Sequence, residues 1–375
     1  MKKIFFTANS GFAIWNFRKR LVESFILEND VYVAIPNTSK EHLNKLDSKI
    51  KFCNIFLNPR NKNIINNIIS FISCAYRVIK IRPDIIFSFT IKNNIYFGII
   101  ARILNINFVP NITGIGSYQN DLSSFKLRLI NFLYKFALKK SSHVFFQNSN
   151  DLNVLIDIGI VTREKCSVIP GSGIDLNDFK FIPNKIEPED QFTFIFASRL
   201  LLAKGIKEFI DASIQVKKEI SRPLKFIICG NHDKEDSRYI DKQALINIKN
   251  IKDMDYLGNV DNIKDIIISS SCVILPTYYN EGVPRILIEG LALGRPIITT
   301  DLPGCNETII EGKTGYFVKP KNVDDLKVKM IKMVNLEPNS YIEMTKYCRK
   351  HAETSFSDEK IIQRYKSLSH SLNND

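Results

Sequence analysis

The chain has 375 residues, 45% of them hydrophobic and 24% charged, an ordinary globular composition whose length fits two or three domains. Its net charge of +13 comes from residues 1–150, which contain 21 Lys/Arg and 7 Asp/Glu, whereas residues 151–375 contain 31 Lys/Arg and 32 Asp/Glu. We therefore expect the first half to bind nucleic acid, an anionic membrane or a phosphorylated substrate. Seven scattered cysteines without C-x-x-C spacing argue against a zinc site or a disulfide framework, and the lack of a signal-peptide pattern and of an apolar stretch of about 18 residues favours a cytoplasmic protein without a transmembrane helix.

The first half alternates short apolar runs with helical stretches, which is typical of a parallel sheet covered on both faces. Strands are predicted at 3–8, 31–36, 50–57, 84–89, 108–113, 144–147 and 168–170. Helices are predicted at 12–29, 63–81, 93–105, 123–140 and 149–159.

The alternation stops at residues 170–191, where prolines, glycines and scattered charges indicate a linker. It then restarts, with strands predicted at 192–198, 224–229, 256–257, 272–276, 296–300 and 315–318 and helices at 203–221, 261–269, 284–293, 323–335, 339–353 and 358–372. We therefore predict an α/β protein of two Rossmann-like doubly wound domains, facing each other across a ligand-binding cleft. The expected divisions are 1–175 for the first domain, 176–191 for the linker, 192–355 for the second domain and 356–375 for a C-terminal helix.

The segment Glu281–Glu289 reads EGVPRILIE and follows a predicted strand and a short loop. Pro284 suits the first turn of a helix, and the free N–H groups of such a turn can bind phosphate. Gly282 would let the backbone approach a ligand closely, whereas Glu289 lies in an apolar helical stretch where a carboxylate needs a partner. The alternative is a capping glutamate followed by an exposed one.

A second pair of charges, Arg199 and Lys204, follows the first strand of the second half in the segment SRLLLAKG. Two cations at the carboxyl end of a strand can neutralise a diphosphate, because arginine engages phosphate oxygens in a fork and lysine acts as a point charge. The alternative is a pair of ordinary surface cations.

These motifs, in this order, resemble those of the GT4-type retaining glycosyltransferases, which have the GT-B fold. The resemblance extends along nearly the whole chain and includes Asn9–Phe12, Val168–Asp175 and Leu257–Val260. It also implies that the C-terminal helix at 356–375 packs back on the first domain. No cofactor and no metal ion are expected.

The resemblance implies a role for each matching residue. Arg199 and Lys204 would hold the donor diphosphate and stabilise the leaving nucleotide, which makes them catalytic together with Glu281, the residue that would contact the donor sugar. Glu289 would bind the ribose hydroxyls. The remaining residues expected at the nucleotide-sugar site are Gly11, Gly258, Val260, Gly282, Val283 and Pro284.

The acceptor side resembles a subgroup that builds bacterial O-antigens and capsules. The chain has Thr90-Ile91-Lys92 where many relatives place a histidine, and Asn111–Gly116 reads NITGIG. The expected acceptor contacts are Arg18, Lys92, Thr113 and Gly114. Arg18 and Lys92 have the alternative of being solvated surface charges.

The stretch 125–140 contains five cations among large apolar residues. It fits a basic amphipathic helix on an anionic membrane, and equally a core helix with a solvated basic edge. Asp253-Met254-Asp255 imitates a metal-binding D-x-D motif, but its position favours a loop.

The expected function is transfer of a sugar, with UDP-N-acetylgalactosamine as the expected donor, to an undecaprenyl-diphosphate-linked saccharide in O-antigen, lipopolysaccharide or capsule biosynthesis. The enzyme would be cytoplasmic and peripheral on the inner membrane. Alternatives are a GT-B-fold sugar-nucleotide 2-epimerase, which needs acid–base residues that the first half lacks, and a non-catalytic binder of anionic lipid or nucleic acid. No nucleic-acid partner is expected, because the usual binding motifs are absent.

Overall fold

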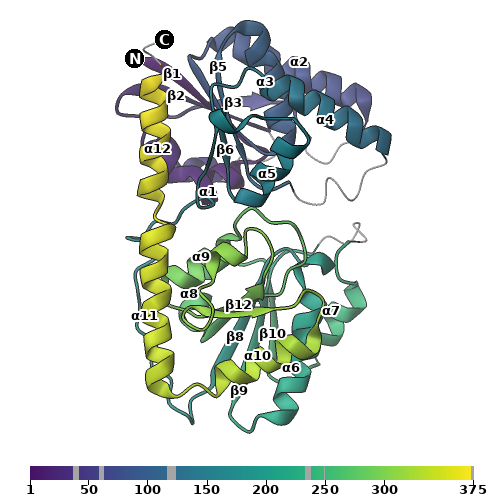
Figure 1. The fold of residues 1–375 in the computed structure, drawn as a ribbon, viewed down its shortest axis with the longest axis vertical. Helices are drawn as coiled ribbons and strands as arrows, with labels where there is room; N and C mark the ends of the chain where they lie inside the picture. The colour runs from purple at the N-terminus through teal and green to yellow at the C-terminus, as the bar shows by residue number, and fades with distance from the viewer. Residues whose placement is uncertain (37–41, 59–62, 116–123, 233–237, 249, 373–375) are drawn as a thin grey trace. The chain divides into compact units, whose positions relative to one another are not determined.

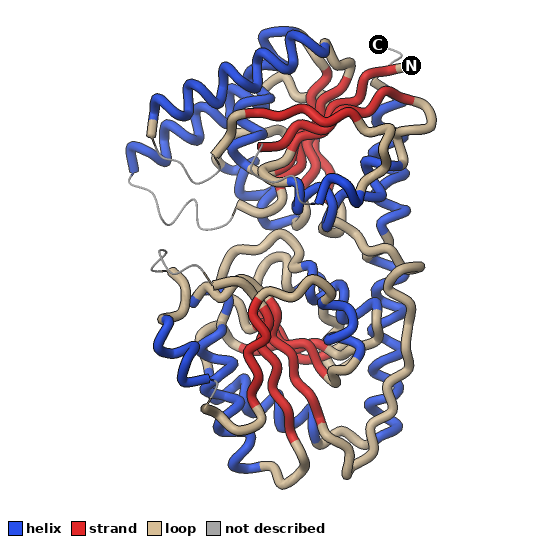
Figure 2. Tube along the Cα trace, turned by 180° about the vertical axis from the view of Figure 1, so that it is seen from behind, coloured by secondary structure: helices blue, strands red, loops and turns tan. Residues whose placement is uncertain are grey.

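The computed structural model describes residues 1–36, 42–58, 63–115, 124–232, 238–248 and 250–372. The chain forms two compact units, the first made of Met1–Gly173 together with Asp358–Asp375 and the second of Ile174–Ser357. Each unit contains one parallel sheet with helices packed against it (Figure 2). The predicted fold class of two Rossmann-like α/β domains is confirmed.

The first unit is built on a seven-stranded sheet with the order β3-β2-β1-β4-β5-β6-β7. Its strands are β1 (Lys2–Thr7), β2 (Asn29–Pro36), β3 (Lys51–Ile55), β4 (Ile85–Phe89), β5 (Asn107–Ile112), β6 (Val144–Phe146) and β7 (Cys166–Val168). Its helices are α1 (Gly11–Glu23), α2 (Ile64–Ile81), α3 (Ile91–Leu104), α4 (Ser124–Leu138), α5 (Ser149–Asp157) and α12 (Asp358–Ser371).

Successive residues of the central strands enter different cores, because side chains of a strand alternate between the two faces of its sheet. Phe5 joins the cluster that packs under α2, α3, α4 and α5, whereas Ile4 and Phe6 join the cluster under α1 and α12. The last helix lies beside the first one, where Arg20 pairs with Asp358 at 2.6 Å (Figure 1). Residues from both ends of the chain therefore complete the first unit.

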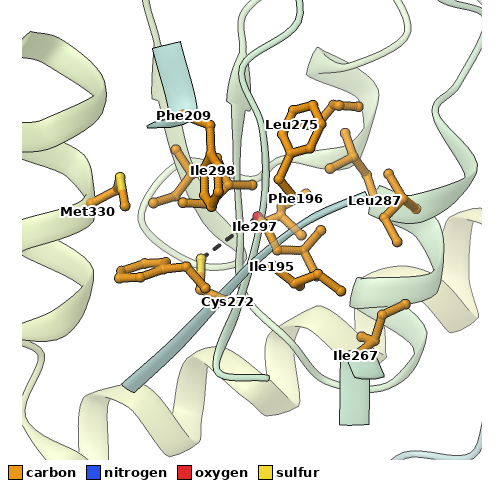
Figure 3. Packing of buried hydrophobic residues seen from close by; sticks show 14 of the residues in the cluster. Ile195, Phe196, Phe209, Ile267, Cys272, Leu275, Leu287, Ile297, Ile298 and Met330 are labelled. Carbon is orange, nitrogen blue, oxygen red and sulfur yellow. Dashed lines mark hydrogen bonds between the residues drawn. The ribbon is translucent and has the colours of Figure 1, made fainter. Parts of the chain in front are cut away.

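The second unit has a six-stranded sheet with the order β10-β9-β8-β11-β12-β13. Its strands are β8 (Phe192–Ala197), β9 (Leu224–Cys229), β10 (Met254–Gly258), β11 (Cys272–Leu275), β12 (Ile297–Thr300) and β13 (Gly315–Val318). Its helices are α6 (Ile206–Glu219), α7 (Lys242–Ile248), α8 (Ile263–Ile268), α9 (Arg285–Ala292), α10 (Val323–Val334) and α11 (Pro338–Ser355). Phe209, Leu287 and Met330 bring three of these helices into the core around the strands (Figure 3).

Several predicted elements differ in detail. The helix expected to reach residue 29 ends at Glu23, where the Ser24 hydroxyl donates to the Leu21 carbonyl and a turn leads into β2. Helix α7 was not predicted, and Asp253-Met254-Asp255 straddles the start of β10 rather than lying in a loop. Residues 176–191 belong to the second unit, and the predicted domain boundaries remain a prediction.

One helix bears on the expectation that the chain has no transmembrane helix. Helix α2 has 18 residues and is apolar enough to cross a bilayer by length and composition, although part of it packs against the first unit.

Candidate functional site

The strand order of the second unit brings two of the predicted donor residues, Lys204 and Glu281, to one point. The chain winds outward through β9 and β10 on one side of β8, and through β12 and β13 on the other side of β11. Ligands of open α/β sheets bind at such a switch point, outside the carboxyl ends of the strands. Lys204 follows β8 and Glu281 follows β11, and these two strands are hydrogen-bonded neighbours.

Lys204 and Glu281 form an ion pair between Nζ and Oε1. Their side chains are only 10% and 12% exposed, so both charges are largely removed from water. The Lys204 ammonium also lies 5.1 Å from the centre of the Tyr279 ring. The structure therefore brings together a cation and a carboxylate that the sequence separates by 77 positions.

Thr277 connects the two loops that carry this pair. Its hydroxyl lies 3.1 Å from the Ala203 carbonyl and 3.3 Å from Glu281 Oε1, and the Tyr278 amide donates to the same Ala203 carbonyl at 2.8 Å. Thr277 was not among the site residues predicted from the sequence. The available signal was a hydroxyl directly after a buried strand and four residues before Glu281, but its partner in the β8 loop could not be identified without the sheet order.

Two glycines allow the loops to approach each other. Gly205 has a φ of +79°, and a β-carbon there would collide with the carbonyl of Pro276. Gly304 has a φ of +83°, and a β-carbon there would collide with the carbonyl of Gly282. Such close backbone contacts are open only to glycine, so both positions hold the site in its present form.

The segment before α9 is packed into the unit. Gly282, Val283 and Pro284 are buried, and Pro284 precedes the first helical residue. Glu289 is 4% exposed and accepts a hydrogen bond from Arg285 Nε at 3.0 Å. Burial raises the pKa of the Glu289 carboxyl, and the Arg285 charge partly offsets that effect. Arg285 is thus the partner that a carboxylate in this apolar helix was expected to need.

The other predicted donor residues are more open. Arg199 is exposed, and no hydrogen bond or ion pair of its guanidinium with another described residue is found. Gly258, at the end of β10, has a φ of +68° and open space around its α-carbon, and Val260 packs partly against the core. Arg199, Gly258 and Val260 thus differ from Lys204 and Glu281, which are paired and largely buried.

The first sheet has its own switch point, between β1 and β4. Gly11 follows β1 as the first residue of α1, whose N-cap Ser10 accepts a hydrogen bond from the Ala13 amide at 3.1 Å. Lys92 follows β4, and Thr113 and Gly114 follow β5. Because β1, β4 and β5 are parallel neighbours, these positions share one edge of the sheet.

Arg18 and Lys92 have defined surroundings. Arg18 is 6% exposed, lies 4.7 Å from the centre of the Phe89 ring and donates to the Phe17 carbonyl at 2.9 Å, so the alternative of a solvated helix charge is wrong. Lys92 Nζ donates to the Asn58 carbonyl at 2.8 Å, and burial lowers the pKa of its ammonium.

A buried polar network supports this edge, and the sequence did not reveal it. Asn94 donates to the carbonyl of Asn111, whose own amide donates to the Tyr365 hydroxyl at 2.8 Å. Asp151 accepts the backbone N–H of Ile115 at 3.2 Å and so holds the residue that follows Gly114. Burial raises the pKa of Asp151 to about 6.

Within the described part of the chain, no group of three His, Cys, Asp or Glu side chains could hold a metal ion. Asp253 and Asp255 instead pair with Lys217 and Lys225 at 2.5 and 2.6 Å. The chemistry open to this site is electrostatic: a cation, a carboxylate and a helix start lie at one edge, where negative charge on a phosphate could be stabilised.

Comparison with known proteins agrees with this geometry. Residues 178–354 match the family described as glycosyl transferases group 1, and residues 3–148 match the family described as glycosyl transferase 4-like. The chain is 26% identical, over 98% of both sequences, to an N,N'-diacetylbacillosaminyl-diphospho-undecaprenol alpha-1,3-N-acetylgalactosaminyltransferase of Campylobacter jejuni. It is 24% identical to a UDP-Gal:alpha-D-GlcNAc-diphosphoundecaprenol alpha-1,3-galactosyltransferase of Escherichia coli, over 82% of this chain and 81% of the relative.

Solved structures share the fold. HepE of Anabaena, in complex with UDP and glucose, superposes with a TM-score of 0.80 at 17% identity, covering 99% of this chain and all of that one. A glycosyltransferase of Rickettsia africae superposes with a TM-score of 0.79 at 18% identity, covering 100% and 99%. The order of motifs, the two doubly wound sheets and the full-length relatives lead to one conclusion: this chain belongs to the GT4-type retaining glycosyltransferases of the GT-B fold.

Proposed function

We propose that the chain transfers a sugar from a UDP-sugar to an undecaprenyl-diphosphate-linked saccharide in O-antigen, lipopolysaccharide or capsule biosynthesis. The proposed donor is UDP-N-acetylgalactosamine, in keeping with the activity named for the Campylobacter relative. The enzyme would be cytoplasmic and peripheral on the inner membrane. The observation that carries the proposal is the buried pair of Lys204 and Glu281 at the switch point between β8 and β11.

The proposed donor site uses the charges of the second unit. The donor diphosphate would compete with Glu281 for the Lys204 ammonium, and the exposed Arg199 would contact the outer phosphate oxygens. Glu281, released from the lysine, would accept hydrogen bonds from the sugar hydroxyls. Glu289 would bind the ribose, with Gly11, Gly258, Val260, Gly282, Val283 and Pro284 completing the site.

The proposed reaction needs no side-chain nucleophile. The oxygen of the acceptor hydroxyl forms the new bond to the anomeric carbon, while the bond from that carbon to the phosphate oxygen breaks on the same face. The hydroxyl proton passes to the departing diphosphate, and Lys204 and Arg199 stabilise the charge of the leaving UDP. Arg18, Lys92, Thr113 and Gly114 would hold the acceptor.

The test is UDP release from purified protein mixed with a panel of UDP-sugars and a lipid-diphosphate N-acetylhexosamine acceptor. We expect release that depends on both substrates and that falls by roughly a hundredfold or more in Lys204→Ala. Lys217→Ala is the matched control, because Lys217 also pairs with a carboxylate but lies beside the start of β10, at the opposite edge of the sheet.

Other outcomes identify other functions. Release of nucleotide from the donor without any acceptor would replace transfer with a hydrolytic or epimerase reaction. An absence of release with every pair, together with salt-sensitive binding to vesicles or nucleic acid, would indicate a non-catalytic binder. Equal loss in Lys204→Ala and Lys217→Ala would remove Lys204 from the proposed site.

A further inference from the structure

Helix α2 is apolar on two opposite faces. Its inner face carries Ser70, Cys74 and Val78, all buried against the core of the first unit. Its outer face exposes Ile65, Ile68, Ile69, Ile72, Tyr76 and Ile79, each between 44% and 66% exposed. These positions recur three and four residues apart, so they form one continuous stripe along about 21 Å of helix.

Comparison with helix α11 shows that such an exposed apolar stripe is unusual in this chain. Helix α11 also has 18 residues and one buried face, but its exposed positions are polar or charged except for Tyr347. Water around α11 therefore meets ordinary polar side chains, whereas water around α2 would meet six large apolar ones. A continuous apolar surface of this kind marks a site of interaction with a membrane or another protein.

A neighbouring helix of the same layer exposes apolar side chains as well. Helix α3 packs between α2 and α4 on one face of the first sheet (Figure 1). Helix α4 exposes Leu129, Phe132 and Phe136, with Arg102 of α3 lying 3.9 Å from the centre of the Phe136 ring. Both helices that flank α3 thus present an apolar outer stripe.

The charge around this surface is almost entirely positive. Residues 63–115 and 127–140 contain 9 Lys/Arg and 1 Asp/Glu, and α2 itself contains no acidic residue. Lys80 and Arg82 are exposed at the end of α2, and Arg128 and Lys135 are exposed on α4. A second copy of the chain on this face would bring like charges together, whereas anionic lipid headgroups would meet complementary ones.

Burial of the inner face decides how α2 meets the lipid. A helix that crossed the bilayer would have to withdraw Cys74 and Val78, both 0% exposed, from the core of the first unit. A helix that lies in the plane of the interface keeps these contacts and buries only the outer stripe. Apolar faces of such interfacial helices reach about 5–10 Å into the boundary between headgroups and acyl chains.

We propose that α2 is a membrane-docking helix that lies flat in the interface of an anionic bilayer, with its isoleucine stripe inserted and the flanking cations on lipid phosphates. The α4 stripe forms the second part of the same contact. The inference rests on the proposed function only because an enzyme with a lipid-linked acceptor binds that acceptor at a lipid surface. Docking itself needs neither the donor nor the acceptor.

The first test measures binding of the full chain to sedimenting vesicles of phosphatidylcholine with about 30% phosphatidylglycerol, which gives them an anionic surface. Replacing Ile65, Ile68 and Ile72 by glutamine should lower the partition coefficient by about tenfold or more, since three inserted side chains are lost. The control replaces Leu27, Ile246 and Val328 by glutamine. These three side chains are comparably exposed but lie outside α2, α3 and α4, so the control variant should bind like the unaltered chain.

A second measurement reports insertion directly. Tyr76→Trp on α2 should give fluorescence that shifts to shorter wavelength when anionic vesicles are added, because the ring leaves water. Tyr347→Trp on α11 is the matched control, an exposed tyrosine on a helix of equal length, and its emission should not shift.

Three results would overturn the docking proposal. They are no vesicle binding by the unaltered chain, equal binding by the α2 triple variant, and no shift for Tyr76→Trp on vesicles that the protein binds. Concentration-dependent dimers that the α2 triple variant abolishes, without vesicle binding, would assign the surface to a second copy instead. UDP release with a short-chain, water-soluble acceptor tests transfer separately, so either proposal can fail while the other stands.

Discussion

Lys204 and Glu281 hold opposite charges at the carboxyl edge of the second sheet, with little access to water. Removing one partner of a largely buried pair leaves the other charge uncompensated, which costs roughly 3–5 kcal/mol. We expect Lys204→Met to lower the free energy of unfolding by about 3 kcal/mol, and the double variant Lys204→Met/Glu281→Gln to recover most of that loss. Urea unfolding of the two single variants and the double variant measures the coupling. Additive losses would show that the two charges do not stabilise each other.

Asp151 supports the loop after β5 through its carboxyl group. Burial raises the pKa of this carboxyl from 3.8 to about 6. The unfolded chain therefore releases this proton first as the pH rises from about 4 to about 6. The stability that Asp151 contributes is complete below pH 4 and is lost as the pH passes 6, with a change of about 3 kcal/mol. Asp151→Asn should remove that part of the pH dependence, as measured by urea unfolding at pH 4 and pH 7. An unchanged difference between the two pH values would contradict the assignment.

The turn from Leu202 to Gly205 is the element that presents Lys204. Gly205→Ala meets both a left-handed backbone and the Pro276 carbonyl, so we expect it to cost more than about 3 kcal/mol of stability and to displace Lys204. Gly258→Ala has a similar φ but no neighbouring atom within 4 Å, and should cost about 1–2 kcal/mol. Thermal unfolding of the two variants separates the cost of the collision with Pro276 from the cost of the left-handed backbone conformation. Equal losses would mean that the close approach to Pro276 contributes nothing.

Periodicity predicted most strands and long helices correctly because the central strands are buried on both faces and read as unbroken apolar runs. It missed α7, whose seven residues are too short to show a helical period. Thr277 was missed for another reason: its hydroxyl matters only because β8 and β11 are adjacent, and Ala203 lies 74 positions away. The open face of α2 was hidden as well, because apolar residues on every side of a helix normally indicate complete burial.

The roles of Arg199, Glu289 and the acceptor residues remain predictions, since they depend on how ligands bind rather than on how the chain folds. The sequence did supply the position of Arg199 and of the acceptor residues after β4 and β5, because each follows a strand at the carboxyl edge of its sheet. Glu289 and Arg18 instead lie inside helices α9 and α1. The burial of Arg18 against the Phe89 ring could not be predicted from the sequence. It depends on packing between α1 and β4, two elements that are separated along the chain.

At the scale of the whole molecule, the first unit depends on its last helix. Tyr365 of α12 is 1% exposed, packs against Phe87 and Phe145, and accepts a hydrogen bond from Asn111. Tyr365→Ala should destabilise the first unit by about 3–5 kcal/mol, and Tyr365→Phe by about 1 kcal/mol. Hydrogen exchange resolved by segment measures the two units separately. Tyr347→Ala on α11 serves as the control and should leave the first unit unchanged.

The place of α12 in the first unit also has a consequence for the time at which that unit can be completed. The ribosome makes residues 1–173 first, then the entire second unit, and only then Asp358–Asp375. At about 5–20 residues per second, the first unit waits roughly 10–40 s for α12, with the sites of Ile361 and Tyr365 still open to water. The second unit, although it begins later, has all its residues earlier. During synthesis the nascent N-terminal half is therefore the part most in need of chaperones, and its apolar surfaces are exposed longest.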